Sequence, residues 1–530
     1  MTFRIVKPLL ALAFSFTFLQ LKAQITDQSK KLGTFYQLVN MAYVDEVDEE
    51  ELVEDAIIAM LKDLDPHSVY IPAKDLEKTN EPLVGKFEGV GIQFNILHDT
   101  ILVVSAISGG PSEKLGIMAG DKIITINDSV VAGVGFQNKD VIKNLRGKKG
   151  TEVKVGIQRG GENKLLDFNI VRDKIPIYSV DASYMANTNS AYLKLNRFAA
   201  TSMEEITPAL DSLSALGMEN LILDLRGNSG GYLNIAIELA DEFLSKGELI
   251  VYTEGKAYPK NETYARAGGR MEKGKLIVLV DEGSASASEI VSGAVQDHDR
   301  GLIIGRRTFG KGLVQKPFNL PDGSAIRLTI SRYYTPSGRS IQRPYEKGGK
   351  DYYKDLYKRF DNGELTDVNA IDFPDSLKYE TLKNKRTVYG GGGIMPDIFV
   401  PLDTTITSGY LTDLIRKGVF NEFSLDYLNG KREELKAQYK TSENFLSQYE
   451  ISPELLESFI QKANEKEIEF IEEDYTISEG RIKLILKALI ARGAFDNSAY
   501  HMVMNSEDNT FNKALECLED GTMKKMKLNY

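Results

Sequence analysis

The sequence predicts an α/β and α+β multidomain protein whose chemistry lies in a parallel α/β core. Apolar runs at residues 220–225 and 275–280 each precede a small-residue loop and an amphipathic segment, as buried parallel strands precede helices. Glycine-separated strand patterns fill the second hundred residues, and helical spacing marks both ends. We therefore predict a leader at 1–23, a helical segment at 24–83, a β-rich domain at 84–172, the core at 173–402 and a helical region at 403–530.

The composition is that of an ordinary globular protein. Hydrophobic residues make up 42% and charged residues 27% of the 530 positions. The net charge is −11 and no long basic run is present, so nucleic acid is not predicted as a partner. The single cysteine, Cys517, excludes an intrachain disulfide framework, and we interpret it as a small buried residue. The four histidines form no HExxH or HxxEH pattern, and no metal or cofactor is predicted.

The first residues resemble a secretory leader. Arg4 and Lys7 precede an apolar run at 8–21, and Ala23 offers a small residue for cleavage before Gln24. The run is shorter than the about 20 residues that span a bilayer. No cysteine follows it, which argues against lipidation. We expect an exported protein, periplasmic or associated with the cell envelope, without an integral membrane span after cleavage.

Residues 24–83 show two helical apolar faces, the first around Phe35 and Leu38 and the second around Ala56 and Met60. The sequence LDPHS at 64–68 ends the second helix, because the residue before a proline avoids helical geometry. For His67 in this turn, a role in stabilising the turn is favoured over a catalytic one.

Residues 84–172 alternate short strands with short helices. Strands are predicted at 101–107 and 152–158 and a helix at 138–145. The glycine-punctuated loop comprises Gly89, Val90, Gly91 and Ile92, and it leads into a strand through Gln93 and Phe94. Successive N–H groups at Gly91 and Ile92 can form an anion-binding nest, and the strand after them can pair with an extended peptide.

The core begins with a strand at 190–195, a helix at 203–216 and the buried strand at 220–225. Next comes the glycine loop RGNSGG at 226–231 and an amphipathic helix. The N–H groups of Gly230 and Gly231 at this strand-to-helix corner suit an oxyanion. The plainer interpretation is a tight turn that needs glycine only for its backbone.

A second corner follows the strand at 275–280. Ser284, Ser286 and Ser288 lie between this strand and a helix predicted at 287–296. After a short strand at 302–304, Lys311 stands between two glycines. We predict that a serine of this corner and Lys311 form a nucleophile and its base. Taken singly, each residue favours the plainer interpretation, in which the serines cap the helix and the lysine is a solvated loop residue.

A histidine base is excluded by distance. His298 lies 12 residues after Ser286 along the same predicted helix, and at 1.5 Å per residue that is roughly 18 Å. Lys311 can act as a base if burial lowers its pKa. Glu289 lies on the same helical face as Ser286 and would raise that pKa, so we expect it to be turned away or paired with Arg226 or Arg307.

The remaining chain carries no further catalytic motif. A long strand is predicted at 324–334, a polar irregular stretch at 343–395 and a strand at 398–400. Helices follow from about 405, including one capped by Ser452 and one at 478–492 that ends at Gly493. The helical tail is either an interaction or dimerisation segment or a packing extension.

Several motifs together resemble the C-terminal processing peptidases, or tail-specific proteases. They are SASAS at 284–288, TFGKG at 308–312, DLRGNSGG at 224–231, LDPHS at 64–68 and GGIMPD at 392–397. The resemblance covers roughly residues 30–402 and implies a crotonase/ClpP-like core with an inserted PDZ domain. It further implies Ser286 as nucleophile, Lys311 as base, Gln315 as its support, Ala287 as second oxyanion donor and GVGI at 89–92 as the loop that binds a substrate carboxylate.

Three hypotheses follow. The first is an exported Ser–Lys endopeptidase that recognises free C-termini of proteins or peptides through its PDZ domain, and that forms a homodimer or binds an adaptor through its helical termini. The second is a PDZ-based scaffold that has lost activity, against which Ser286, Lys311 and Gln315 all count. The third is a crotonase-type lyase or hydratase, which the leader and the PDZ domain disfavour. We adopt the first.

Overall fold

The computed structural model describes residues 26–160, 162, 164–266, 268–346 and 348–530. The predicted leader at 1–23 therefore lies outside the described residues. The chain divides into two compact units, Met1–Leu61 and Lys62–Tyr530, and each is described by itself. In the described part, no helix is both long enough and apolar enough to span a membrane.

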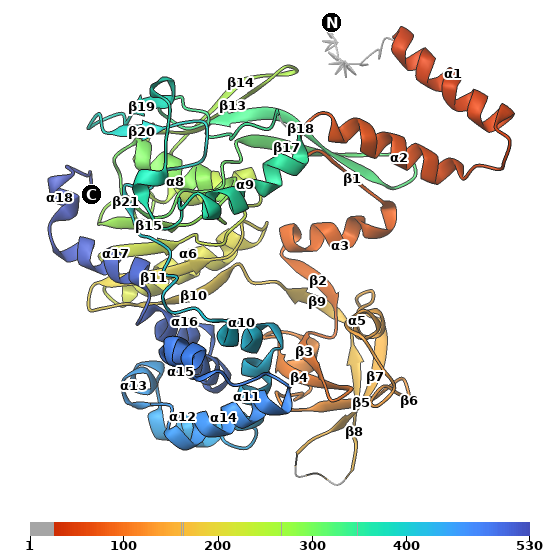
Figure 1. The fold of residues 1–530 in the computed structure, drawn as a ribbon, viewed down its shortest axis with the longest axis vertical. Coiled ribbons are helices and arrows are strands. Elements are labelled where there is room, and N and C mark those ends of the chain that lie inside the picture. Colours follow the sequence, from red (N-terminus) through yellow and green to blue (C-terminus); the bar gives the residue numbers. More distant parts are fainter. Residues whose placement is uncertain (1–25, 161, 163, 267, 347) are drawn as a thin grey trace, which may run out of the picture. The chain divides into compact units, whose positions relative to one another are not determined.

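The first unit is helical, as predicted, with α1 (Asp27–Ala42) and most of α2 (Glu49–Lys62) (Figure 1). Thr26 caps α1, because its hydroxyl accepts a hydrogen bond from the N–H of Ser29 at 3.2 Å. The Tyr36 hydroxyl donates to Glu49 and ties the two helices together. Large apolar side chains on α1 are exposed, among them Phe35 at 61% and Met41 at 85%.

The second unit is built around a mixed sheet in the order β10-β11-β12-β15-β16-β21, as traced through the described residues. Only β10 runs antiparallel to its neighbour. The parallel strands are continuous apolar runs because both sheet faces are covered, which confirms the predicted α/β core. The strands are β10 (Val180–Met185), β11 (Ser190–Leu195), β12 (Asn220–Asp224), β15 (Leu276–Val280), β16 (Leu302–Gly305) and β21 (Ile398–Phe399).

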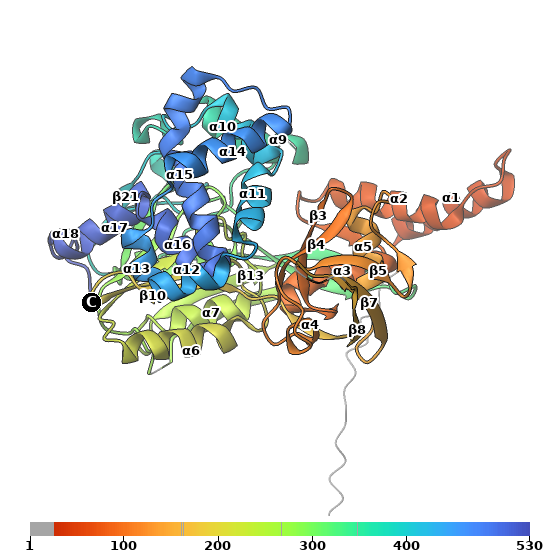
Figure 2. The same cartoon turned by 90° about the horizontal axis from the view of Figure 1, so that it is seen from below.

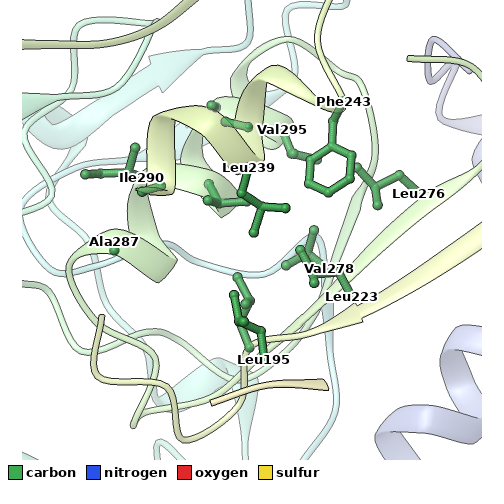
Figure 3. Close-up of a cluster of buried hydrophobic side chains, with 14 of the residues drawn as sticks. Leu195, Leu223, Leu239, Phe243, Leu276, Val278, Ala287, Ile290 and Val295 are labelled. Carbon is green, nitrogen blue, oxygen red and sulfur yellow. The ribbon is translucent and has the colours of Figure 1, made fainter. Parts of the chain in front are cut away.

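Two hydrophobic clusters occupy the two faces of this sheet. Leu221 and Leu223 of β12 belong to one cluster and Ile222 between them to the other, as the alternation of a strand requires. The first cluster packs against α6 (Ser202–Ala215), α7 (Leu233–Asp241) and α8 (Ala287–Asp297), and the second against α17 (Asn509–Glu519). Figure 2 shows α6 and α7 on the opposite side of the sheet from α17. Figure 3 shows Leu239 and Phe243 meeting Leu223 and Val278 across the first. This packing fixes the two strand-to-helix corners that begin α7 and α8.

A second sheet has the order β1-β18-β13-β14, with β17 also paired to β18, in the described chain. The long strand β18 (Ala325–Tyr334) was predicted, whereas β1 (Val69–Ile71), β13 (Leu249–Gly255), β14 (Tyr258–Tyr264) and β17 (Leu313–Asn319) were not. The loop at 308–312, here called the lysine loop, carries Lys311 and ends where β17 begins. Pairing of β1 with β18 brings the LDPHS turn, just before β1, beside this loop.

The inserted domain is a separate antiparallel sheet, β3-β4-β5-β7-β8, with β6 paired to β5 in the described residues. A two-stranded ribbon of β2 and β9 joins it to the rest. Its elements are β2 (Lys86–Gly89), β3 (Ile92–Leu97), β4 (Thr100–Ala106), α4 (Pro111–Lys114), β5 (Lys122–Ile126), β6 (Ser129–Val130), α5 (Asn138–Leu145), β7 (Glu152–Gln158), β8 (Leu166–Val171) and β9 (Asp173–Pro176). The helix α3 (Ala73–Val84) precedes it.

The prediction of an irregular stretch at 343–395 was wrong in part. It contains α9 (Gly349–Asp361), the 3-10 turns Val368–Ala370 and Asp375–Leu377, and the hairpin of β19 (Lys378–Glu380) and β20 (Thr387–Tyr389). Helix α9 is polar, and its buried face consists of Tyr352 and Arg359 rather than aliphatic residues. The Arg359 guanidinium donates to the carbonyl of Thr308 at 2.9 Å, which anchors the helix on the lysine loop.

The C-terminal region is helical, as predicted. Its helices are α10 (Gly409–Arg416), α11 (Val419–Leu428), α12 (Arg432–Tyr439), α13 (Ser442–Gln448), α14 (Pro453–Glu465), α15 (Glu472–Ala494), α16 (Asn497–Asn505), α17 and α18 (Thr522–Lys525). The prediction that Gly493 ends a helix was wrong, because α15 continues to Ala494. A Cβ at Gly493 would lie 2.2 Å from Leu428 Cδ1. Glycine stands there so that two helices can pack closely.

Candidate active site

The three serines of the corner between β15 and α8 differ in what they contact. The hydroxyls of Ser284 and Ser288 are buried and donate to the carbonyls of Leu225 and Asn228, each at 2.8 Å. These two serines therefore tie the corner to the glycine loop. Ser286 is partly exposed and has φ 55° and ψ −109°. A non-glycine residue with positive φ is strained, and such strain is concentrated at functional sites.

Glu289 connects the serine corner to the lysine loop. One carboxylate oxygen accepts hydrogen bonds from the N–H groups of Ser286 at 2.8 Å and Lys311 at 2.9 Å. The other oxygen accepts from the N–H of Gly310 at 2.7 Å and from the Thr308 hydroxyl. Burial raises the pKa of Glu289, while these hydrogen bonds oppose the rise.

The expectation that Glu289 is turned away or paired with arginine was therefore wrong. Arg226 pairs with Asp224 and Asp508, and Arg307 pairs with Glu364. Glu289 is the third residue of a helix that begins after Ser286, so its side chain reaches back to the Ser286 N–H in a capping box. The sequence SASE at 286–289 could have suggested this cap, but the lysine-loop partners depend on the fold.

Tyr333 supplies a second connection. Its buried hydroxyl lies 3.1 Å from the carbonyl oxygen of Ser286 and 2.8 Å from that of Lys311. The main chains on which the two predicted catalytic residues stand are thus joined by Tyr333 and by Glu289. Sequence reasoning did not single out Tyr333, since it lies in the middle of an ordinary-looking strand pattern.

The side chain of Lys311 is held by Gln315. The ammonium nitrogen donates to Gln315 Oε1 at 3.1 Å, and the Gln315 amide donates to the carbonyl of His67. Burial lowers the pKa of Lys311 and the nearby charge of Arg327 lowers it further, while Glu289 and Asp65 act in the opposite direction. Within the described chain, the structure contains no ion pair between Lys311 and a carboxylate.

His67 is part of this support. Its N–H donates to Asp65 Oδ1 at 2.8 Å, consistent with a turn-stabilising role, and its ring Nε2 lies 2.9 Å from the Tyr352 hydroxyl of α9. Burial and then the Lys311 charge lower the pKa of His67 to about 4. No sequence signal placed Tyr352 here, because α9 itself was not predicted.

The glycine loop lies directly against the serine corner. A Cβ built on Gly230 would lie 2.9 Å from Ser286 Cβ and 3.0 Å from the nitrogen of Ala287. A Cβ on Gly231 would lie 2.1 Å from the carbonyl oxygen of Phe198. Both positions have positive φ, 100° and 150°, so glycine is required there by conformation and by close approach.

The backbone N–H groups of Gly230, Gly231 and Ala287 differ in whether they have a hydrogen-bond acceptor within the protein. That of Gly230 donates to Asn228 Oδ1 at 2.9 Å and is occupied within the protein. Within the described residues, the N–H groups of Gly231 and Ala287 have no acceptor. In the described residues, the N–H groups left without an acceptor are therefore those of Gly231 and Ala287 rather than that of Gly230, and Ala287 directly follows Ser286.

In the inserted domain, the loop Gly89 to Ile92 borders a cavity of about 150 Å³. Ile92 and Phe94 of β3 line one side and Ile142 and Leu145 of α5 the other. The Arg146 guanidinium also borders it, 4.5 Å from the centre of the Phe87 ring. The cavity has the size and apolar lining for a single side chain, and Arg146 was not singled out from the sequence.

The fold and this site define the class of protein: a serine peptidase with an α/β core and an inserted PDZ domain. Four family models match the chain. They are "Peptidase family S41" at 189–348, "PDZ domain" at 89–170, "Activating protease CtpB N-terminal domain" at 17–75 and a "Family of unknown function (DUF8443)" at 410–496.

Curated relatives extend the similarity beyond the core. A carboxy-terminal-processing protease of Bartonella bacilliformis is 38% identical over 59% of this chain and 73% of its own length. The carboxy-terminal processing protease CtpA of Bacillus subtilis is 36% identical over 67% of this chain and 74% of its own. A probable CtpA-like serine protease of Staphylococcus epidermidis is 32% identical over 83% of each. The chain belongs to the carboxy-terminal processing proteases of peptidase family S41.

Proposed function

We propose that the protein is an exported endopeptidase that recognises substrate C-termini through its PDZ domain and cleaves with a Ser286–Lys311 dyad. The observation that carries the proposal is the double connection of the two residues' main chains by Glu289 and Tyr333, at a corner against which the glycine loop packs. Such a connection holds together the main chains of a nucleophile and its base without a histidine.

The reaction follows from these groups. Neutral Lys311 takes the proton of the Ser286 hydroxyl as Oγ attacks the substrate carbonyl carbon. The resulting oxyanion accepts hydrogen bonds from the N–H groups of Gly231 and Ala287. The Lys311 ammonium then protonates the leaving amine as the C–N bond breaks, which leaves an acyl group on Ser286. Water, deprotonated by Lys311, attacks this ester, and the Lys311 ammonium returns the proton to Ser286 Oγ as the C–O bond to the acyl group breaks. The acyl part leaves as a carboxylic acid, which ionises in solution, and Lys311 is neutral again.

Lys311 must be neutral for this role, and its surroundings on balance lower its pKa, which makes the neutral form more accessible. Burial disfavours the ammonium, and Arg327 adds a repulsive charge. Each unit by which the pKa falls corresponds to about 1.4 kcal/mol of differential destabilisation. Gln315 offers its Oε1 to the lysine nitrogen and so orients the side chain in either protonation state.

In this proposal residues 84–172 select the substrate and residues 173–402 cleave it. The loop at Gly89, Val90, Gly91 and Ile92 would bind the terminal carboxylate through its N–H groups, and the apolar cavity would hold the last side chain. The exposed apolar residues of α1, including Phe35 and Met41, suit contact with a second copy or an adaptor.

The decisive experiment replaces the dyad. Ser286→Ala and Lys311→Ala should each abolish cleavage of an unstructured peptide that ends in a free leucine carboxylate, because two groups that act as a unit are lost together. Ser212→Ala and Lys316→Ala, both at exposed positions, should cleave at the wild-type rate. Circular dichroism would show that the folds match. Substantial activity in Lys311→Ala would remove the lysine from the role of base.

Export is tested separately. Because the leader pattern predicts cleavage after Ala23, the N-terminal sequence of the protein from an envelope or periplasmic fraction should begin at Gln24. Recovery of chains that begin at Met1 in the cytoplasmic fraction alone would contradict export while leaving the proposed dyad intact.

A further inference from the structure

The last helices of the chain complete the protease core. Helix α17 covers one face of the central sheet, where Phe511 meets Tyr192 edge to face with ring centres 5.4 Å apart. Cys517 and Leu518 of the same helix are buried in the same cluster. This segment lies beyond the 410–496 match to the family of unknown function. Its packing places the beginning of α17 at the edge of the sheet where the glycine loop starts.

Asp508 caps α17 and also reaches that loop. One carboxylate oxygen accepts the N–H of Phe511 at 2.7 Å, which satisfies the first turn of the helix. Both oxygens accept from Arg226 Nη1, each at 2.9 Å. The arginine is 17% exposed and Asp508 30%, so the pair is shielded from much of the solvent.

Arg226 is the first residue of the glycine loop and is held from two sides. Its Nη2 and Nε donate to the buried Asp224 at 2.7 and 3.1 Å, opposite the contact with Asp508. Lys194 also contacts Asp224, at 3.1 Å. Two cations and two carboxylates therefore form one nearly neutral cluster where the loop begins.

The other end of the loop is tied to the nucleophile. The carbonyl of Asn228 accepts from the N–H of Ala285 at 3.0 Å and from the Ser288 hydroxyl at 2.8 Å. The Asn228 side chain meanwhile accepts from Gly230. The path from Arg226 to the free N–H of Gly231 is thus short and hydrogen-bonded at most of its steps.

We propose that Asp508 is a positioning residue for catalysis: the C-terminal segment 497–530 holds Arg226 through Asp508 and so keeps the glycine loop, which carries the Gly231 N–H, in place against the serine corner. Its catalytic part rests on the proposed function. The structural part concerns the loop alone. Asp508 touches neither substrate nor nucleophile in this scheme and acts only through Arg226.

The first test measures the loop without any assay of activity. Asp508→Asn keeps a good helix cap but removes the negative charge that forms the ion pair with Arg226. Asp496→Asn is the matched control, because Asp496 caps α16 in the same way and accepts from Ala499 at 2.9 Å. In the full-length protein, amide hydrogen exchange across residues 225–232 should become about tenfold faster in Asp508→Asn and stay unchanged in the control. Unchanged exchange in both would overturn the proposal.

The second test measures the catalytic consequence. With the leucine-terminated peptide, Asp508→Asn should lower kcat by about tenfold and leave KM within twofold, since loss of a whole oxyanion donor costs about 100- to 1000-fold. A peptide boronic acid, whose tetrahedral adduct resembles the intermediate, should lose affinity by the same factor. The inactive Ser286→Ala protein allows substrate binding to be measured without cleavage. If Asp508→Asn, added to Ser286→Ala, weakens binding of the substrate peptide by the same factor of about ten, Asp508 has a general structural role and the proposal is overturned.

A double-mutant cycle identifies Arg226 as the intermediary. Arg226→Met should itself lower kcat, and Asp508→Asn should then have no further effect in that background. Additive losses would show that Asp508 acts by another route. A rise of kcat in Asp508→Asn would show that its charge opposes the oxyanion, which also overturns the proposal.

Protein stability is followed in parallel. If Asp508→Asn unfolds at the assay temperature, Asp508→Ser, which retains the cap and lacks the bidentate acceptor, takes its place. If the wild type cuts no peptide, the proposed function fails, while hydrogen exchange still decides whether Asp508 positions the loop.

Discussion

At the scale of single residues, the opposite charges of Arg327 and Glu289 shift the pKa of the predicted base, Lys311, in opposite directions. Burial lowers the pKa of Lys311 and so does Arg327, whereas Glu289 raises it. Glu289 is nevertheless retained in a fully buried position, where it accepts the N–H groups of both Ser286 and Lys311. Its electrostatic effect is unfavourable for a neutral lysine, so its value to the site lies in geometry.

The two charges should shift the pH profile in opposite directions. The reaction needs neutral Lys311, so kcat/KM should rise with pH through the pKa of this lysine. Glu289→Gln removes a charge that favours the ammonium and should move this rise to lower pH. Arg327→Gln removes a charge that disfavours it and should move the rise to higher pH. Profiles of kcat/KM between about pH 6 and 10 measure both shifts.

The Glu289 variant should also lose activity at every pH. A glutamine amide cannot accept all four hydrogen bonds, so the plateau of kcat should fall by about 10- to 100-fold through misplacement of the dyad. Glu254→Gln, at an exposed position of β13, is the control and should match the wild type in both respects. If the Glu289 and Arg327 variants shift in the same direction, charge does not set the profile.

Some residues near the Ser286–Lys311 dyad can be predicted from the sequence and others cannot. Ser286, Lys311 and Gln315 stand in recognisable local motifs, and the structure places the Gln315 amide oxygen against the lysine. Tyr333 and the carbonyl of His67 could not be predicted, because neither has a local signature and both reach the site through strand pairing. Gly230 is predicted as a donor because it lies at a strand-to-helix corner, where N–H groups lack intrahelical partners, but its N–H donates to the Asn228 side chain instead.

At the scale of elements, apolar content decided what could be predicted. The strands β12, β15 and β16 are buried on both faces and were evident as apolar runs. Strand β14, with the sequence YPKNETY, is largely exposed and exists because it pairs with β13. Helix α9 is polar and packs through Tyr352 and Arg359. Such elements are specified by partners that are distant in sequence, so periodicity does not detect them.

Gly493, which lies inside α15 rather than at its end, gives a prediction for which a second glycine of the same helix is the control. Gly480 and Gly493 lie in the same helix, but a Cβ at Gly480 would meet nothing within 4 Å, whereas at Gly493 it would lie 2.2 Å from Leu428 Cδ1. Gly480→Ala should therefore raise the free energy of unfolding by about 0.5–1 kcal/mol through helix propensity.

Gly493→Ala should instead lower the free energy of unfolding by about 1–3 kcal/mol. Leu428 is buried, so it cannot move aside without disturbing its cluster. Urea unfolding followed by circular dichroism measures both variants. Equal stabilisation by the two alanines would show that Leu428 moves freely and that Gly493 has no packing role.

At the scale of the whole molecule, the division of labour rests on the inserted domain. Its cavity, bordered by the loop Gly89 to Ile92, is apolar except for Arg146.

The sequence allows two interpretations of the helical tail: an interaction or dimerisation segment, or an extension that packs on the core. The structure shows packing for α17, which buries Phe511 and Cys517 on the central sheet. An amphipathic pattern alone could not reveal which surface that helix covers.

If the inserted domain selects substrates by their C-termini, blocking the terminus should slow cleavage. A free carboxylate would be bound by charge-assisted hydrogen bonds worth roughly 1.5–3 kcal/mol each. We predict that amidation of the leucine-terminated peptide lowers kcat/KM at least about tenfold, the effect of about 1.4 kcal/mol. A stopped-flow or fluorescence assay with the two peptides at equal concentration measures this ratio.

The ratio should depend on the cavity and not on the rest of α5. Ile142 lines the cavity and Lys143, the next residue, is exposed. Ile142→Ser should bring the ratio towards one, because the last side chain loses its apolar contact and the terminus is no longer held near the loop. Lys143→Ser should keep the wild-type ratio. If the intact enzyme cuts free-acid and amidated peptides equally fast, the terminus is not what the domain recognises, and it must serve instead as a lid or as a docking site for an internal segment.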